Sequence, residues 1–257
     1  MIEFFISFVL WNILNIIVMN LNLKDGYLKR NDMLDFRNRI VSIIHGFFVL
    51  LLSTYNTLFV HSGCGEGNTR LEVLIMNFSN GYFAYDFVAM AYLGILDKSM
   101  FIHHLICMGG LTGGLWTGFS ADVLVSSLSF TEISNPSMHT MKMLRLLGYR
   151  YTKAFEVSEW SYMILYIFGR SFLGLPLLYR TWMCDTNNLF VKVMGLSLIT
   201  YSFYYMRQMI SILKSRAIEK GERKSKNIKM KWFTPLTNDE ISKIDAYNKK
   251  TTKKRTE

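Results

Sequence analysis

The sequence has few prolines, few cysteines and an excess of basic over acidic residues. Only 3 of its 257 residues are proline and 51% are hydrophobic, which disfavours the disordered and fibrous classes. Its three cysteines form no pair of Cys-x-x-Cys motifs, so a zinc site of that type is excluded. The Walker loop and the Gly-x-Ser-x-Gly elbow are also missing, and the corresponding nucleotide-binding and hydrolase classes find no support.

Long apolar stretches separated by short polar breaks recur along most of the chain. Because a membrane-spanning helix needs ~20 apolar residues, the pattern predicts an all-α polytopic membrane protein of about seven transmembrane helices. We expect them near residues 2–21, 40–60, 73–95, 100–118, 121–141, 159–182 and 189–213. The fifth is the most polar and contains Pro136, which predicts a kink. Its polar groups must face protein or a water-filled cavity.

The basic residues follow the alternation of the loops. They fill the first and fifth loops and the tail, and one lies in the third loop, whereas the alternate loops are nearly free of them. The loop residues concerned are Lys24, Lys29, Arg30, Arg37, Arg39, Lys98, Lys142, Arg145, Arg150 and Lys153. The positive-inside rule then predicts an outer N-terminus and a tail in the cytosol or its equivalent. The formal charge of +10 therefore indicates membrane topology and no nucleic-acid partner.

Two of the cysteines fall in predicted outer loops. Cys64 follows the second helix and Cys184 follows the sixth, whereas Cys107 lies inside the fourth. A disulfide between the outer two requires an oxidising lumen, and two free thiols are the alternative. The first helix begins directly after Met1 without a basic n-region, so we expect it to be a retained span.

Ionisable side chains lie inside the predicted helices. Four of the five histidines are expected at a similar depth in the membrane. Intramembrane ionisable residues cost ~2.5 to 3.5 kcal/mol each on insertion scales and mark functional sites by default. The helical groups are His45, Asp86, His103, His104, Glu132, His139, Arg170 and Arg207.

Helical spacing groups several of these residues on common faces. The three faces hold Tyr82 with Asp86, Glu132 with Pro136 and His139, and Ser42 with His45. Three such stripes can converge on one cavity. His103 and His104 point ~100° apart as neighbours on a helix, so we expect one to face the cavity and the other a neighbouring helix.

A structural interpretation of the same residues stays open. Membrane histidines can hydrogen-bond neighbouring helices, and Asp86 can form a structural ion pair with Arg170. We predict that Gly109, Gly113 and their neighbours serve close helix packing. No metal site is predicted, because adjacent histidines on a helix cannot readily chelate one ion.

Four segments occur in an order that resembles the TLC domain family of membrane proteins. They read RIVSIIHG, NGYFAYDFVAM, FIHHLICMGG and TEISNPSMHTMKMLRLLG. The family includes the ceramide synthases, the translocating-chain-associating membrane protein and small TLC-domain proteins. The resemblance implies six helices around a tunnel for a lipid or acyl chain, with one helix before them. It divides the chain into a first helix and basic loop at 1–38, a TLC-like domain at 39–214 and a basic tail at 215–257.

The resemblance also implies candidate site residues. In ceramide synthases the matching histidine pair and downstream acids serve acyl transfer from acyl-CoA to a sphingoid base. By that likeness His103, His104, Asp86 and Glu132 are candidate catalytic residues. His45, Tyr82, Tyr85, His139 and Arg170 are candidate lipid-binding residues. Imidazole, with an ordinary pKa of ~6.5, is chemically suited to deprotonate an amine or accept an acyl group.

The sequence departs from the synthase pattern at its second acid. Synthases carry a His-Asp step followed by an acid three residues later, whereas this chain has Thr131, Glu132 and then Asn135. The likeness is therefore greater to the small TLC-domain proteins. We expect a protein that binds or handles a membrane lipid in the endoplasmic reticulum or another endomembrane. We expect it to need no cofactor. Acyl-CoA would be a co-substrate only if the protein is an acyltransferase.

The basic tail suggests an alternative class of function. Thr237 and Glu240 match a helix capping box, and Ile241 with Ile244 forms an apolar stripe, so a short docking helix is expected. Such a segment suits a non-catalytic subunit held in a larger membrane complex, for example in the mitochondrial inner membrane. Trp232 among lysines equally suits an anionic membrane surface.

Overall fold

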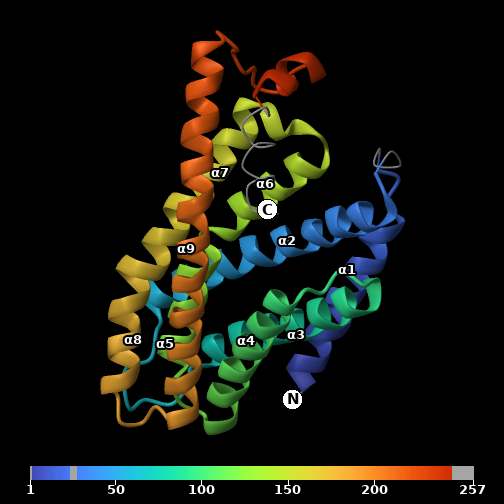
Figure 1. Ribbon diagram of the computed structural model, residues 1–257. Coiled ribbons are helices and arrows are strands. Elements are labelled where there is room, and N and C mark those ends of the chain that lie inside the picture. Colours follow the sequence, from blue (N-terminus) through green and yellow to red (C-terminus); the bar gives the residue numbers. More distant parts are fainter. Residues whose placement is uncertain (1, 24–27, 245–257) are drawn as a thin grey trace.

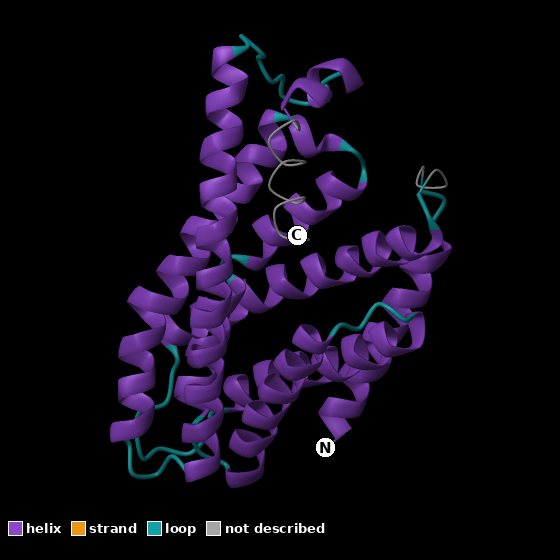
Figure 2. Ribbon diagram, in the orientation of Figure 1, coloured by secondary structure: helices purple, strands orange, loops and turns teal. Residues whose placement is uncertain are grey.

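The computed structural model describes residues 2–23 and 28–244, and this part of the chain consists of helices joined by loops (Figure 2). The elements, in chain order, are α1 (Ile2–Asn20), α2 (Arg30–Phe59), α3 (Arg70–Leu93), α4 (Lys98–Thr117), α5 (Ala121–Glu132), α6 (Asn135–Leu146), the 3₁₀-helix η1 (Tyr149–Tyr151), α7 (Lys153–Ile167), the π-helix η2 (Phe168–Leu173), α8 (Gly174–Met183) and α9 (Leu189–Ser225). The all-α prediction is therefore confirmed for the described residues.

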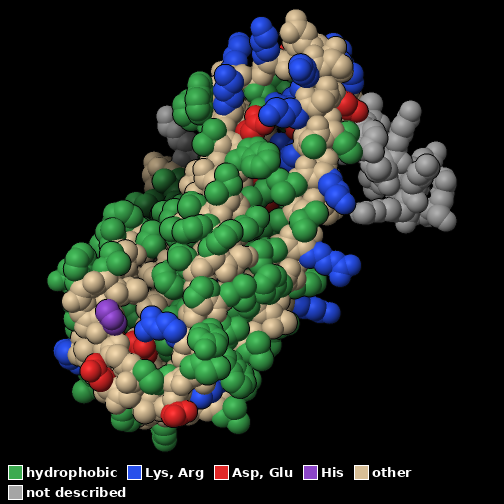
Figure 3. Space-filling model, turned by 90° about the vertical axis from the view of Figure 1, so that its left-hand side faces the viewer, with side chains coloured by type: hydrophobic (Ala, Val, Ile, Leu, Met, Phe, Trp, Pro, Cys, Tyr) green, Lys and Arg blue, Asp and Glu red, His purple; other side chains and the backbone are tan. Residues whose placement is uncertain are grey.

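Among the described residues, four helical runs are long and apolar enough to cross a membrane by length and composition. They are α1, α2, the continuous run of α7, η2 and α8, and α9. The 24-residue α3 carries polar side chains such as Asn77, Asn80 and Asp86 that are buried inside the protein, which lowers its hydropathy. Figure 3 shows a broad hydrophobic surface over the lower body and lysines and arginines gathered at the upper end. This distribution is the one expected of an integral membrane protein.

The predicted fifth helix is two helices in the structure. The sequence suggested one span over 121–141 with a kink, but α5 ends at Glu132 and α6 begins at Asn135. Pro136 lies in the first turn of α6, where its missing N–H costs nothing. Two other boundaries differ, because α2 begins at Arg30 in the basic loop and α9 continues beyond Leu213 to Ser225.

The N-terminal end of α1 and three loops gather at one end of the molecule. The loops join α2 to α3, α4 to α5 and α8 to α9 (Figure 1). Their contacts are the Asn68 N–H with the Gly118 carbonyl at 2.8 Å, the Gly65 N–H with Thr186 Oγ1 at 3.2 Å, an ion pair of Glu3 with Arg70, and a disulfide between Cys64 and Cys184. These are the segments that the charge pattern assigned to one side of a membrane.

The tail docks on its own chain at the opposite end. Residues 238–244 are helical, and Ile244 is buried with Met230 and Leu236 in a small apolar cluster. The Lys153 N–H at the start of α7 donates to the Lys231 carbonyl at 2.8 Å. Residues 245–257 of the predicted tail lie outside the described residues.

The predicted capping box starts the tail helix. The Thr237 N–H donates to Glu240 Oε2 at 2.8 Å, and the Glu240 N–H donates back to Thr237 Oγ1 at 3.4 Å. The hydrogen bond from the Thr237 backbone lowers the pKa of the Glu240 carboxyl. Because the pKa is lowered on folding, this contribution to stability is present above the ordinary range of a glutamate and lost as the pH falls.

The disulfide predicts a specific labelling pattern. In protein denatured without reductant, a maleimide-polyethylene glycol reagent should add one chain, at Cys107, which is the free cysteine. After reduction three chains should add. Three chains without reductant would show that Cys64 and Cys184 are free thiols. The Cys107→Ser variant is the matched control, and with the disulfide formed it should add no chain before reduction and two after it.

Candidate functional site

The helices of the described chain enclose a central cavity of about 540 Å³. Residues from α2 to α9 line it, whereas α1 packs along α3 outside it. Ligand sites for small molecules typically have volumes of ~300–1,000 Å³, so the space is sufficient for a ligand.

Most residues singled out in the sequence line this cavity. They are His45, Tyr82, Asp86, His103, His104, Glu132, His139 and Arg170. Tyr85 does not line it and is fully buried in the packing between helices. The helical stripes therefore converge in space as expected, although convergence alone assigns no role to any residue.

His104 is held on both sides of its ring. Its Nδ1 lies 2.7 Å from the carbonyl oxygen of Met100 one turn earlier, and its Nε2 lies 2.9 Å from Oδ2 of Asp86 on α3. A carbonyl oxygen only accepts, so Nδ1 carries the proton of the first bond. With both nitrogens engaged and the ring 1% exposed, His104 has no free atom for a substrate.

Asp86 extends this hydrogen-bonded chain to α2. Its Oδ1 accepts from Asn38 Nδ2 at 2.8 Å, and Asn38 Oδ1 accepts from the Tyr85 hydroxyl at 3.1 Å. One carboxylate thus joins α2, α3 and α4. Buried polar groups are retained at low cost only when each finds a partner, and here they partner one another.

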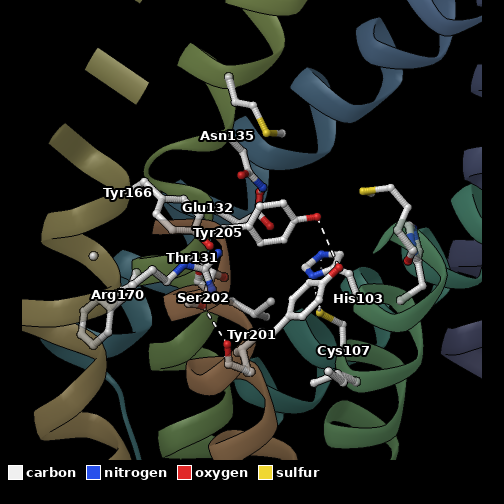
Figure 4. Close-up of a pocket in the computed structure, with 18 of the residues that line it drawn as sticks. His103, Cys107, Thr131, Glu132, Asn135, Tyr166, Arg170, Tyr201, Ser202 and Tyr205 are labelled. Carbon is white, nitrogen blue, oxygen red and sulfur yellow. Dashed lines mark hydrogen bonds between the residues drawn. The ribbon is translucent and has the colours of Figure 1, made fainter. Parts of the chain in front are cut away.

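His103 is the member of the histidine pair that faces the cavity. Its ring contacts the thiol of Cys107, with Sγ 3.7 Å from Nε2, which is at most a weak hydrogen bond. Figure 4 shows the ring beside the cavity with Tyr201 and Tyr205 of α9. Both histidines line the cavity, and His104 is the one that is bonded to a neighbouring helix, through Asp86 of α3.

Glu132 lies where α5 ends, against a glycine of α2. Its Oε2 accepts from Asn135 Nδ2 at 2.8 Å across the break between α5 and α6. A Cβ added to Gly46 would lie 3.0 Å from that same oxygen, so the absence of a side chain makes room for the carboxylate.

His45 and Tyr82 form a stacked pair in the cavity wall. The ring centroids are 3.6 Å apart and the planes differ by 9°. The Trp11 ring of α1 meets both edge-on, at 5.5 Å from His45 and 5.3 Å from Tyr82. Nε2 of His45 is buried without a hydrogen-bond partner among the described residues.

Charged residues surround the cavity toward the basic end of the molecule. Arg39 pairs with Asp35 at 2.8 Å, and its Nη1 lies 3.4 Å from Nδ1 of His139. Arg216 of α9 bonds Glu159 of α7 at 2.8 Å and 2.9 Å. These groups are largely satisfied by one another.

Several residues of the site have weak sequence signals. Asn38 belongs to the basic first loop by pattern, and Asn135 looked like the loss of a synthase acid, yet both hold carboxylates of the site. Tyr201 and Tyr205 have helical i, i+4 spacing that marks a shared face. Arg207, which the pattern placed inside a helix, is exposed on α9.

Metal ligands do not cluster in the described part of the chain. No group of three or more histidine, cysteine, aspartate or glutamate side chains there is arranged to hold an ion. The side chains of His103, Glu132 and Arg170 can hydrogen-bond a ligand, and the imidazole and the carboxyl can also transfer a proton.

The different environments of the two histidines predict different effects of substitution. His104→Ala should lower the free energy of unfolding by ~1–3 kcal/mol, because Asp86 and the Met100 carbonyl lose a buried partner. His103→Ala should leave stability close to wild type. Thermal unfolding of the purified protein in one detergent measures both, and equal destabilisation by the two changes would contradict this assignment.

The family comparison agrees with this arrangement. Residues 35–215, which include the cavity-lining parts of α2 to α8 and most of α9, match the family model for the TLC domain. The match covers most of the chain, and with the helical architecture it identifies an integral membrane protein of a lipid-related family. The chain belongs to the TLC domain family.

Proposed function

We propose that this protein handles a membrane lipid by holding its acyl chain in the central cavity. The observation that carries the proposal is the cavity itself, about 540 Å³ in volume inside a membrane-type helical bundle. An empty apolar space of this size would cost packing energy that helices can avoid by moving closer together. A ligand that fills it recovers those contacts.

The lining of the cavity suits an amphipathic ligand. Toward the disulfide end its wall is largely apolar, from residues of α8 and α9 such as Leu177, Val191, Met194 and Leu198. Toward the basic end it includes Arg39, Lys142, Arg145 and Arg216. The acyl chain of a lipid can lie against the apolar wall, and its polar headgroup can lie beside the basic residues.

An acyl-transfer activity is the finer form of this proposal, and the ring of His103, whose contact with Cys107 is at most a weak hydrogen bond, favours it. In this reaction a lipid amine attacks the carbonyl carbon of acyl-CoA, the C–N bond forms and the C–S bond breaks. His103 takes the proton from the amine nitrogen and returns it to the leaving thiolate. His104 is unsuited to that role because Met100 and Asp86 occupy both of its nitrogens.

A role as a structural subunit receives less support from the tail. The described tail segment already packs on its own chain through Met230, Leu236 and Ile244. A partner is therefore not needed to order it. The paired Cys64 and Cys184 require an oxidising compartment on their side of the membrane, and we propose the endoplasmic reticulum, whose lumen is oxidising.

Filling the cavity tests the binding proposal. Gly195 lines the cavity on α9, and its nearest neighbours are the side chains of Leu178 and Thr181. Gly195→Phe should remove most copurifying lipid, as measured by native mass spectrometry and lipid extraction. Gly221→Phe, on the same helix with nothing within 4 Å of an added Cβ, should retain it. Equal lipid content in both variants, with melting temperatures close to wild type, would contradict the proposal.

A kinetic assay tests the acyl-transfer form. Protein in nanodiscs with palmitoyl-CoA and sphinganine as probes should release thiol, and His103→Gln should lower the rate by ~10²- to 10⁴-fold because general acid–base help is lost. Copurified lipid measures whether the cavity of the variant is intact. Wild-type protein that binds lipid but releases no thiol would sink the catalytic form and leave the lipid-binding one.

A further inference from the structure

Arg170 is a buried cation on the wall of the central cavity. It lies in the π-helix η2, which interrupts the helical run between α7 and α8, and is 6% exposed. Its Nε and Nη1 have no hydrogen-bond partner among the described residues. π-Helical turns inside α-helices occur frequently at functional sites, since they displace a side chain from its regular position.

The neighbours of Arg170 leave its Nε and Nη1 without a hydrogen bond. Its guanidinium carbon lies 5.1 Å from the centre of the Tyr166 ring, which gives a cation–π contact and no hydrogen bond. The nearby acid Glu132 accepts a bond from Asn135. The arginines nearer the basic end differ, since Arg39 and Arg216 each have a carboxylate partner.

The backbone fixes Arg170 where α5 ends. A Cβ added at Gly169 would overlap the carbonyl oxygen of Phe130, so η2 and α5 are in backbone contact. Figure 4 shows the guanidinium of Arg170 directed inward near Thr131 and Glu132. The π-helix and the end of α5 thus hold a rigid, unsatisfied donor toward the cavity.

Buried guanidinium N–H groups without hydrogen-bond acceptors are costly, because the hydrogen bonds they made to water are not replaced. We infer that Arg170 binds the carboxylate of a fatty acid whose chain lies along the apolar wall of α8 and α9. The inference rests on the proposed function, because it specifies the lipid for the same cavity. Guanidinium donors form a planar fork that matches a carboxylate in two parallel hydrogen bonds.

The charge at this point favours a carboxylate over a phosphate monoester. Arg170 supplies one positive charge and the acid Glu132 lies near it, so the ligand group that adds less negative charge is favoured, and a carboxylate adds only one. A phosphate monoester carries ~1.5 to 2 negative charges near pH 7, and its excess would lie close to the acid Glu132. The apolar wall begins two turns further along the same helical run at Leu177, which gives the chain its place.

A pair of probe ligands that differ only in charge tests this inference. Palmitate and methyl palmitate are compared by competition with radiolabelled palmitate in nanodiscs at pH 8. Wild-type protein should bind palmitate at least ~10-fold more tightly than the ester, the factor expected of a charge-assisted hydrogen bond. Arg170→Gln should bind both equally, with the affinity for the ester retained. Arg207→Gln, which removes an exposed arginine, should behave as wild type.

The outcomes separate this inference from the proposal on which it rests. If wild type binds neither probe, the lipid cavity itself is refuted. If it binds acid and ester equally, or if Arg170→Gln keeps the preference, the carboxylate site is refuted while the lipid cavity stands. Tighter binding of hexadecyl phosphate than of palmitate would also overturn the carboxylate assignment. Should Arg170→Gln fail to fold, Arg170→Lys keeps the charge without the fork and should reduce the preference.

Discussion

The carboxylate of Asp86 is the constraint on which the arrangement of the site depends. A membrane interior offers no water to satisfy polar groups, so each must find a partner in the protein. Asp86 accepts from Asn38 of α2 and meets the ring of His104 of α4. By fixing three helices and engaging a ring nitrogen of His104, it leaves His103 as the member of the pair with the freer ring. The histidine pair is thus one structural residue and one site residue.

Two irregular segments make the cavity possible. Regular helices of this composition would pack closely along their length, whereas α5 breaks after Glu132 and the α7–α8 run passes through the π-helix η2. Gly169 brings these two irregularities into contact. The irregular backbone lies beside a lined cavity inside the protein, where membrane proteins tolerate it. It places Glu132 and Arg170 on the same wall.

The sequence predicted the helices and the distribution of loop charge well, but it did not predict which side chains bond to one another. Apolar periodicity predicted the helices, and loop charge predicted which loops gather at one end, because both follow from local composition. The sequence showed that His103 and His104 point apart on their helix. It could not show which of them Asp86 would bond, because that depends on how α3 packs against α4. The π-helix around Arg170 was not predicted, because its residues do not differ in composition from those of the neighbouring α-helices. Arg207 lies in a helix as predicted, but its side chain is exposed, because a charge within an apolar run can face outward near the end of a span.

The most direct test of this account is an experimental density map of the protein purified in nanodiscs without added ligand. The account predicts an elongated density in the central cavity, bounded by α8 and α9, with one end beside the side chain of Arg170. A map in which α5 and the α7–α8 run close on each other, with side chains filling the space, would contradict it.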